Sequence, residues 1–101
     1  MAARFEWDRT KAAINLRKHA VSFDVAVRVF ADPFALTVLE EDVSGEQRWQ
    51  RLGLVEGHLL LLVAHTTRDD EEGGQPIEVI RIISARAADR KERRRYEQET
   101  R

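Results

Sequence analysis

The sequence predicts a single α+β domain, with two N-terminal helices, a four-stranded antiparallel sheet and a C-terminal helix in the order ααββββα. Three observations support this class. Apolar residues recur at helical spacing in the first 33 residues, short strand-like segments follow, and a charged helix-forming segment closes the chain. A chain of 101 residues can bury one hydrophobic core, so residues 1–101 are expected to form one domain.

The first two helices are predicted by their caps. Asp8 can accept hydrogen bonds from first-turn N–H groups of a helix that is expected to end near His19. Ser22 can cap a second helix, which Asp32 and Pro33 should end. Its buried face is predicted by four residues at positions i, i+3, i+4 and i+7: Phe23, Ala26, Val27 and Phe30.

Four segments rich in β-branched and aromatic residues predict the strands: FALTVLE, QRWQRLGLVE, HLLLLVAHTT and IEVIRIIS. Residues 55–58 are expected to form a tight hairpin, whereas the acidic residues 68–76 are expected to form a longer loop. Short connections favour antiparallel pairing. The last helix is expected from about Ala85, with Ser84 as a candidate cap.

Composition excludes several classes of function. With 17 basic and 18 acidic residues, the net charge of -1 argues against a binder of nucleic acid that works by bulk charge. The absence of cysteine excludes disulfides and thiolate sites. No apolar run spans a bilayer, so a cytoplasmic protein without membrane contact is expected. No phosphate-binding glycine loop or magnesium-binding carboxylate cluster is present, so neither cofactor nor metal is expected.

Basic residues gather at the predicted junction of the last strand and the last helix. Between residues 81 and 97 there are seven of them: Arg81, Arg86, Arg90, Lys91, Arg93, Arg94 and Arg95. Arg81 lies between two isoleucines and should point away from the core, so with Arg86 it could clamp a phosphate. Alternatively, the two arginines form ordinary ion pairs with Glu46 or Glu78.

The arginines of the last helix have a simpler explanation. A charged helix face is usually only solvated, and it can also steer phosphates toward a site. Three of these residues are candidates for RNA contact: Arg90, Arg93 and Arg94. Tyr96 in the same helix is expected in the core or at its rim, as are Trp7 and Trp49.

Histidine and glutamate provide candidate groups for proton transfer. Lys18 and His19 close the first helix and His65 closes an apolar strand, and each histidine is either a proton carrier or a structural residue. Glu46 and Arg48 share one strand face, either as general base and charge stabiliser or as a surface pair.

This set of side chains suits RNA cleavage without metal, in which the 2′-OH of the substrate is the nucleophile. The protein then needs only to align the strand, move two protons and stabilise the pentavalent phosphate. An alternative from another class is a non-catalytic binding module, whose basic junction docks an acidic partner or a nucleic-acid backbone.

Three stretches in order, FEWDRTKAAINLRKHAVSFDVAVRVFADP, EQRW and IRIISARAADRKERRRYE, resemble the BrnT family of type II toxin-antitoxin systems. The resemblance covers the chain except residues 34–45 and the acidic segment. It implies a RelE-like fold and a ribosome-independent, metal-free endoribonuclease that inhibits translation. It also implies a BrnA-type ribbon-helix-helix antitoxin that neutralises the toxin by forming a hetero-oligomer with it. In that complex only the antitoxin would contact operator DNA.

The resemblance implies the following site residues in this sequence: Lys18, His19, Glu46, Arg48, Arg81, Ser84 and Arg86, with Arg93 and Tyr96 in the last helix. In the hypothesis that follows, Arg81 and Arg86 hold the scissile phosphate and Glu46 or His19 accepts the 2′-OH proton. His65 or Tyr96 protonates the leaving oxygen. The family commonly has glycine where this chain has Ala20, and a left-handed alanine there would cost about 1 kcal/mol and alter how His19 is presented.

Overall fold

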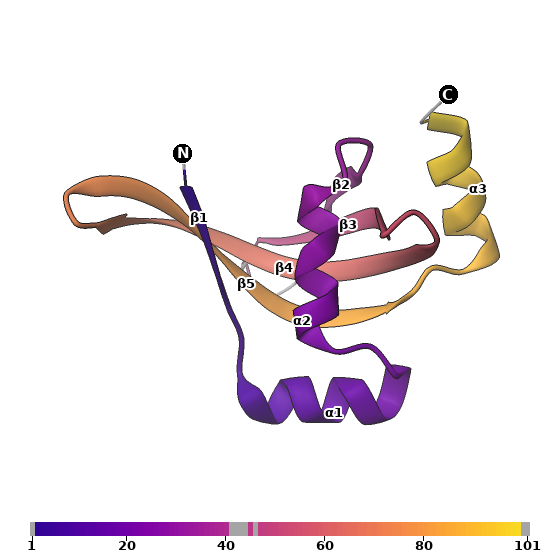
Figure 1. Cartoon of the computed structure of the whole chain (residues 1–101), viewed down its shortest axis with the longest axis horizontal. Helices are drawn as coiled ribbons and strands as arrows, with labels where there is room; N and C mark the ends of the chain where they lie inside the picture. The colour runs from indigo at the N-terminus through magenta and orange to yellow at the C-terminus, as the bar shows by residue number, and fades with distance from the viewer. Residues whose placement is uncertain (1, 41–44, 46, 100–101) are drawn as a thin grey trace.

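The computed structural model describes residues 2–40, 45 and 47–99, which form a five-stranded sheet with helices on both of its faces (Figure 1). The elements in chain order are β1 (Ala2–Glu6), α1 (Arg9–His19), α2 (Phe23–Ala26), the 3₁₀ helix η1 (Val27–Ala31), β2 (Leu36–Glu40), β3 (Arg48–Val55), β4 (Leu59–Glu72), β5 (Gln75–Ala87) and α3 (Arg90–Glu99). The strand order is β1-β5-β4-β3-β2, and only the pair β1 and β5 is parallel.

The predicted α+β class is therefore correct, but the predicted four-stranded antiparallel sheet and the order ααββββα are wrong in detail. Strand β1 precedes the helices and pairs in parallel with residues 77–81 of β5, which makes the sheet mixed. Phe5 anchors β1, because its ring lies 5.2 Å from the ring of Phe30 in η1. Among the strands that the structure describes, β1 pairs only with β5 and therefore forms one edge of the sheet.

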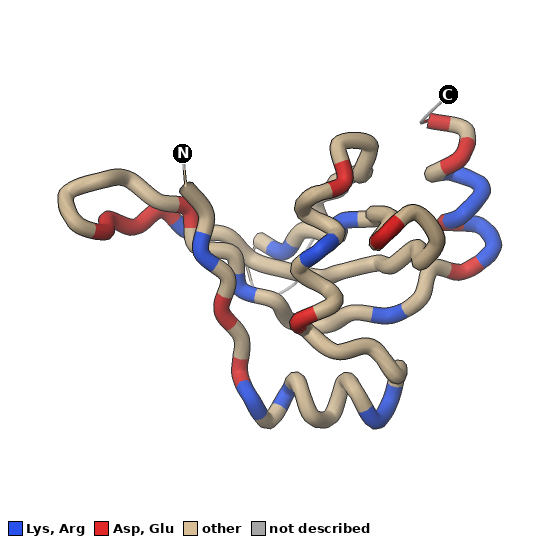
Figure 2. The backbone as a smooth tube through the Cα atoms, in the orientation of Figure 1, with Lys and Arg blue, Asp and Glu red and all other residues tan. Residues whose placement is uncertain are grey.

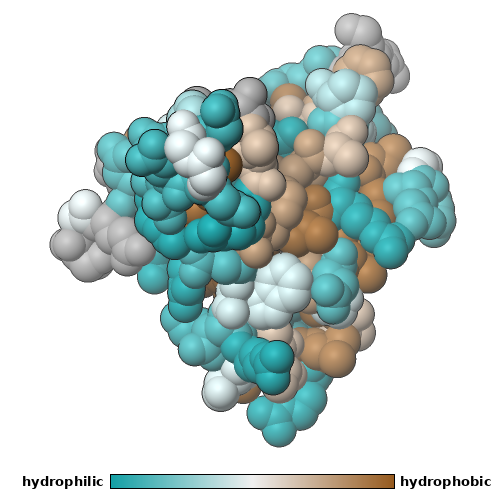
Figure 3. Space-filling model, turned by 60° about the vertical axis from the view of Figure 1, so that its left-hand side comes forward, coloured by the Kyte–Doolittle hydropathy of each residue, from teal (hydrophilic) through white to brown (hydrophobic). Residues whose placement is uncertain are grey.

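The acidic segment is a two-stranded arm instead of the expected loop. Strand β4 runs on to Glu72 and β5 begins at Gln75, so only two residues connect them. Both are glycines with positive φ, Gly73 at 58° and Gly74 at 80°, as a two-residue hairpin of type I′ requires. The arm projects from the body of the molecule in Figure 1, and it is covered by hydrophilic side chains where it comes forward in Figure 3.

The predicted caps of the first two helices are confirmed. Asp8 accepts a hydrogen bond of 2.9 Å from the Lys11 N–H, and α1 ends at His19. Ala20 follows in the left-handed conformation with φ 58°, and its N–H donates to the Leu16 carbonyl. Ser22 accepts from the Val25 N–H at 3.2 Å and begins α2.

The start of the last helix lies later than predicted. Ser84 and Ala85 still belong to β5, and α3 begins only at Arg90. Asp89 is the cap, since its carboxylate accepts from the Glu92 N–H at 2.7 Å. The Glu92 carboxylate accepts from the Asp89 N–H at 2.9 Å, which completes a capping box. Ser84 as a helix cap is therefore wrong.

The sheet has two faces with different covers. The face that packs against α2 and η1, here called the α2 face, buries Phe23, Val29 and Ile82 in the main core. The opposite face, here called the α3 face, buries Leu52 and Leu60 beneath Tyr96 of α3 in a smaller cluster. Side chains alternate along a strand and paired residues share a face, so each paired strand residue can be assigned to one side, on either side of the register shift between Ala64 and His65.

Candidate functional site on the α3 face

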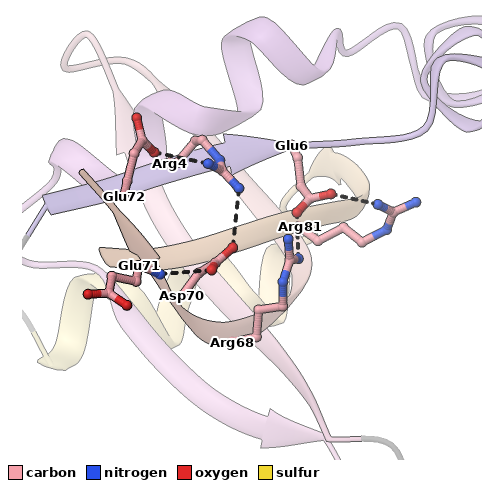
Figure 4. A network of polar contacts seen from close by, with 7 residues as sticks. All are labelled: Arg4, Glu6, Arg68, Asp70, Glu71, Glu72 and Arg81. Carbon is pink, nitrogen blue, oxygen red and sulfur yellow. Dashed lines mark hydrogen bonds and ion pairs between the residues drawn. The ribbon is translucent and has the colours of Figure 1, made fainter. Parts of the chain in front are cut away.

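Arg81 lies on the α3 face and is held by an acidic residue that the sequence did not suggest. Its neighbours Ile80 and Ile82 are 4% and 1% exposed on the α2 face, as predicted, so Arg81 points the other way. There its guanidinium donates to Glu6 of β1 at 3.0 Å. Glu6 also binds Arg68 of β4, so one carboxylate joins arginines from two strands (Figure 4).

Polar contacts continue along the arm. Arg4 of β1 binds Glu72 at 2.9 Å and Asp70 at 3.6 Å, next to the Glu6 group in Figure 4. The hydrogen bond from Arg68 lowers the pKa of Glu6 against a smaller opposing effect of burial, and the charge of Arg81 adds to the lowering. Glu6 is therefore ionised and holds the Arg81 guanidinium on the α3 face, near the β1 edge of the sheet.

Arg86 is fixed more tightly, at the exit of β5. It forms two parallel hydrogen bonds with the Glu92 carboxylate, at 2.8 and 2.9 Å. The hydrogen bond from Arg86 lowers the pKa of Glu92, and the same contact raises the pKa of Arg86. Because Glu92 is also half of the capping box, the guanidinium is tied to the first turn of α3.

The two arginines do not converge on one point. Arg81 pairs with Thr66 and Arg86 pairs with Leu62, so their backbones lie four β4 residues apart, or about 13 Å at the usual rise per residue. They also turn toward different partners, one in β1 and one in α3. This spacing suits two phosphates of one strand rather than the single phosphate that the sequence suggested, with Ser84 between them on the same face.

Helix α1 is joined to β5 by Asn15, which binds the backbone of the residue before Arg86. The free edge of β5 beyond β1 is covered by this buried amide, which accepts from the Ala85 N–H at 3.1 Å and donates to the Ala85 carbonyl at 2.8 Å. Asn15 thus replaces a neighbouring strand. Lys18 and His19 follow it by three and four positions, so they lie on the side of α1 that faces the Arg86 end of β5.

Of the predicted pair on β3, Glu46 lies outside the described residues. Arg48 begins β3 opposite Glu40 and belongs to the α3 face, two strands away from β5. Its position is compatible with the predicted site, because Arg48 and Arg81 lie on the same side of the sheet.

The two predicted donors for the leaving oxygen lie elsewhere. His65 pairs with Ile82 and is 3% exposed on the α2 face, so the sheet separates it from Arg81. Tyr96 is buried under α3, and its hydroxyl donates to Asp32 at 2.6 Å. Burial and the Asp32 carboxylate raise the pKa of Tyr96 to about 12. Both residues are therefore buried, and these surroundings favour a structural role over the proton transfer that the sequence suggested.

The arginines of α3 point into solvent. Arg90, Arg93 and Arg94 are all exposed, which agrees with a solvated helix. Figure 2 shows basic residues along α3 and at the end of β5, so the exit of this strand carries positive potential. Such a surface attracts a phosphate backbone without reading its sequence.

Within residues 2–40, 45 and 47–99, no three His, Cys, Asp or Glu side chains are grouped as metal ligands. In the same part of the chain, no helix is both long and apolar enough to cross a membrane.

Comparison with known proteins gives a family and a fold. A family model described as "Ribonuclease toxin, BrnT, of type II toxin-antitoxin system" matches residues 7–92. The crystal structure of the Brucella abortus ribonuclease toxin BrnT is similar, with a TM-score of 0.56 and 17% identity, over 89% of this chain and 100% of that one. No curated protein sequence matches.

Proposed function

Because the chain belongs to the BrnT family of ribonuclease toxins of type II toxin-antitoxin systems, we propose that it is a ribosome-independent endoribonuclease that cleaves RNA without a metal ion and so inhibits translation. The observation that carries this proposal is the row of Arg81, Ser84 and Arg86 along β5, with both guanidinium groups fixed by carboxylates. Fixed donors stabilise a developing phosphorane charge without reorganising during the reaction.

In the proposed reaction the 2′-OH of one nucleotide attacks the adjacent phosphorus and displaces the 5′ oxygen of the next nucleotide. The products are a 2′,3′-cyclic phosphate and a free 5′-hydroxyl. Arg86 contacts the scissile phosphate and Arg81 binds the backbone of the same strand. His19, or Glu46 outside the described residues, accepts the 2′-OH proton. Lys18, at the same helix end, stabilises the charge on the leaving 5′ oxygen, which takes a proton from water to become the 5′-hydroxyl.

We further propose that the partner is a BrnA-type antitoxin with a ribbon-helix-helix DNA-binding dimer, and that both proteins act in the cytoplasm. The basic row would attract an acidic segment of the antitoxin, so inhibition would be occlusion of the α3 face in a hetero-oligomer. Operator DNA would be contacted only through the antitoxin. The non-catalytic binding module is not favoured by the family match.

The test is incubation of the purified chain with a defined RNA in excess EDTA, followed by analysis of the ends. Cleavage that persists and gives 2′,3′-cyclic phosphates is expected. Loss of cleavage with EDTA, or 3′-hydroxyl ends, would reject the mechanism. Salt-sensitive RNA binding without any turnover would instead indicate a binding module.

A further inference from the structure

A groove crosses the α2 face beside η1, and the proposed function makes no use of it. Its volume is about 280 Å³. This is near the lower end of the roughly 300–1,000 Å³ of small-molecule sites, so it fits one nucleotide-sized ligand rather than a strand of RNA.

The strand register orders the side chains along the groove. Thr37 and Arg51 pair at one end, and Trp49 and His65 pair one step further along. Glu78 borders the other end, since its partner on β4 lies four residues beyond His65. The groove therefore runs from a cation, past an aromatic middle, to a carboxylate.

The cationic end is fixed before any ligand binds. The Arg51 guanidinium lies 5.0 Å from the centre of the Phe30 ring. It donates to the Val29 carbonyl at 3.3 Å, to Thr37 Oγ1 at 3.0 Å and to the Asp32 carbonyl at 3.5 Å. A guanidinium has five N–H donors, so two of them are still available to an anion.

The middle of the groove is aromatic and uncharged. Trp49 is half-buried, and the His65 ring packs edge-on against Phe30 with the ring centres 4.9 Å apart. Burial lowers the pKa of His65, and the charge of Arg51 adds to the lowering, so the imidazole is neutral at pH 7. A neutral aromatic surface suits a planar ring, since bases stack on tryptophan regardless of their sequence.

The acidic end selects the edge of that ring. The side chain of Glu78 carries two carboxylate oxygens, which can accept hydrogen bonds from two adjacent N–H groups. Among the four RNA bases, guanine is the one whose Watson–Crick edge carries two adjacent donors, the N1–H and the 2-amino group.

We propose that this groove binds a single guanine nucleotide, with its phosphate at Arg51 and Thr37, its base on Trp49 and its Watson–Crick edge at Glu78. The site lies on the opposite side of the sheet from Arg81 and Arg86. It is therefore a second site, and it does not depend on the proposed ribonuclease reaction.

The experiment is a titration of the full chain with GMP, AMP, CMP and UMP, in which tryptophan fluorescence reports binding. The titration uses a Trp7→Phe background, so that the fluorescence comes from Trp49 alone. Phenylalanine at position 7 keeps an aromatic ring against Phe23. Saturable quenching that is strongest for GMP is expected. Guanosine should bind more weakly than GMP, because it lacks the phosphate.

Glu78→Gln should weaken GMP binding about 10-fold or more, through loss of charge-assisted acceptors, and should leave AMP nearly unchanged. Glu97→Gln, on exposed α3, is the matched control and should have no effect. Absence of saturable quenching at millimolar nucleotide, equal affinity for all four nucleotides, or an unchanged GMP affinity in Glu78→Gln would overturn the proposal. Arg81→Ala should lose RNA cleavage and keep GMP binding, so failure of one proposal is distinguishable from failure of the other.

Discussion

Replacing Glu92 by glutamine tests whether one carboxylate both caps α3 and holds Arg86. The side chain of Glu92 is 19% exposed and that of Arg86 is 39% exposed, so solvent screens their contact. Charge-assisted hydrogen bonds contribute about 1.5–3 kcal/mol each when buried, and we discount the pair here to about 1 kcal/mol. Glutamine can still accept from the Asp89 N–H, so Glu92→Gln should lower the free energy of unfolding by about 1 kcal/mol. Glu92→Ala should lower it by about 1 kcal/mol more, because it also removes the cap.

The assay is urea unfolding of the Glu92 variants against Glu97→Gln, a neighbouring exposed glutamate of α3. The native pKa of Glu92 is lowered, so its stabilisation is fully present above its ordinary value of 4.5 and is lost as the pH falls through the native pKa. The gap between wild type and Glu92→Gln should therefore close in acid. RNA cleavage should fall too, because Arg86 loses its fixed orientation. Equal stability of the Glu92→Gln and Glu97→Gln variants at pH 7 would refute this reasoning.

Three further variants address the rest of the fold. Asn15→Ala should lower the free energy of unfolding in urea by about 2 kcal/mol or more, because it leaves the N–H and carbonyl of Ala85 buried without partners. A decrease below about 0.5 kcal/mol would contradict the role of this amide. Ala20→Gly should raise the melting temperature, because glycine removes the cost of about 1 kcal/mol for a left-handed alanine, and an unchanged or lower value would contradict the strain. Tyr96→Phe should lower the free energy of unfolding by about 1–2 kcal/mol and reduce RNA cleavage only in proportion to folded protein. Loss of cleavage by a fully folded variant would instead support the catalytic role that the sequence suggested for the hydroxyl.

The elements that the sequence predicted correctly depend on local signals. The side chains of Asp8 and Ser22 each accept a hydrogen bond from the backbone N–H three residues later. A cap of this kind needs no partner from elsewhere in the chain. The hairpin at residues 55–58 likewise depends on its own backbone, with Glu56 and Gly57 at positive φ. The acidic arm was missed although its two adjacent glycines could have indicated a hairpin, because the composition of residues 68–72 favours a loop.

The elements that were missed depend on partners distant in sequence. Strand β1 forms only because residues 77–81 offer it an edge, and its five residues carry little strand signal of their own. The alternation of apolar residues around Arg81 predicted the face of the sheet on which this side chain lies. Its partner Glu6 could not be predicted in the same way, because it lies 75 residues away in the sequence. The face of His65 could not be predicted, because the run that precedes it is uniformly apolar and a bulge shifts the register at this point.

The most direct test of whether the fixed arginines on the α3 face cleave RNA compares the cleavage rates of Arg86→Ala, Arg81→Ala and Arg28→Ala in EDTA. Arg28 is a matched control, since it is an exposed arginine of η1 in an ion pair with Glu56. We expect Arg86→Ala and Arg81→Ala each to lose about 100-fold or more in cleavage rate while they remain folded, and Arg28→Ala to match wild type. Cleavage at the wild-type rate by folded Arg86→Ala would contradict this expectation.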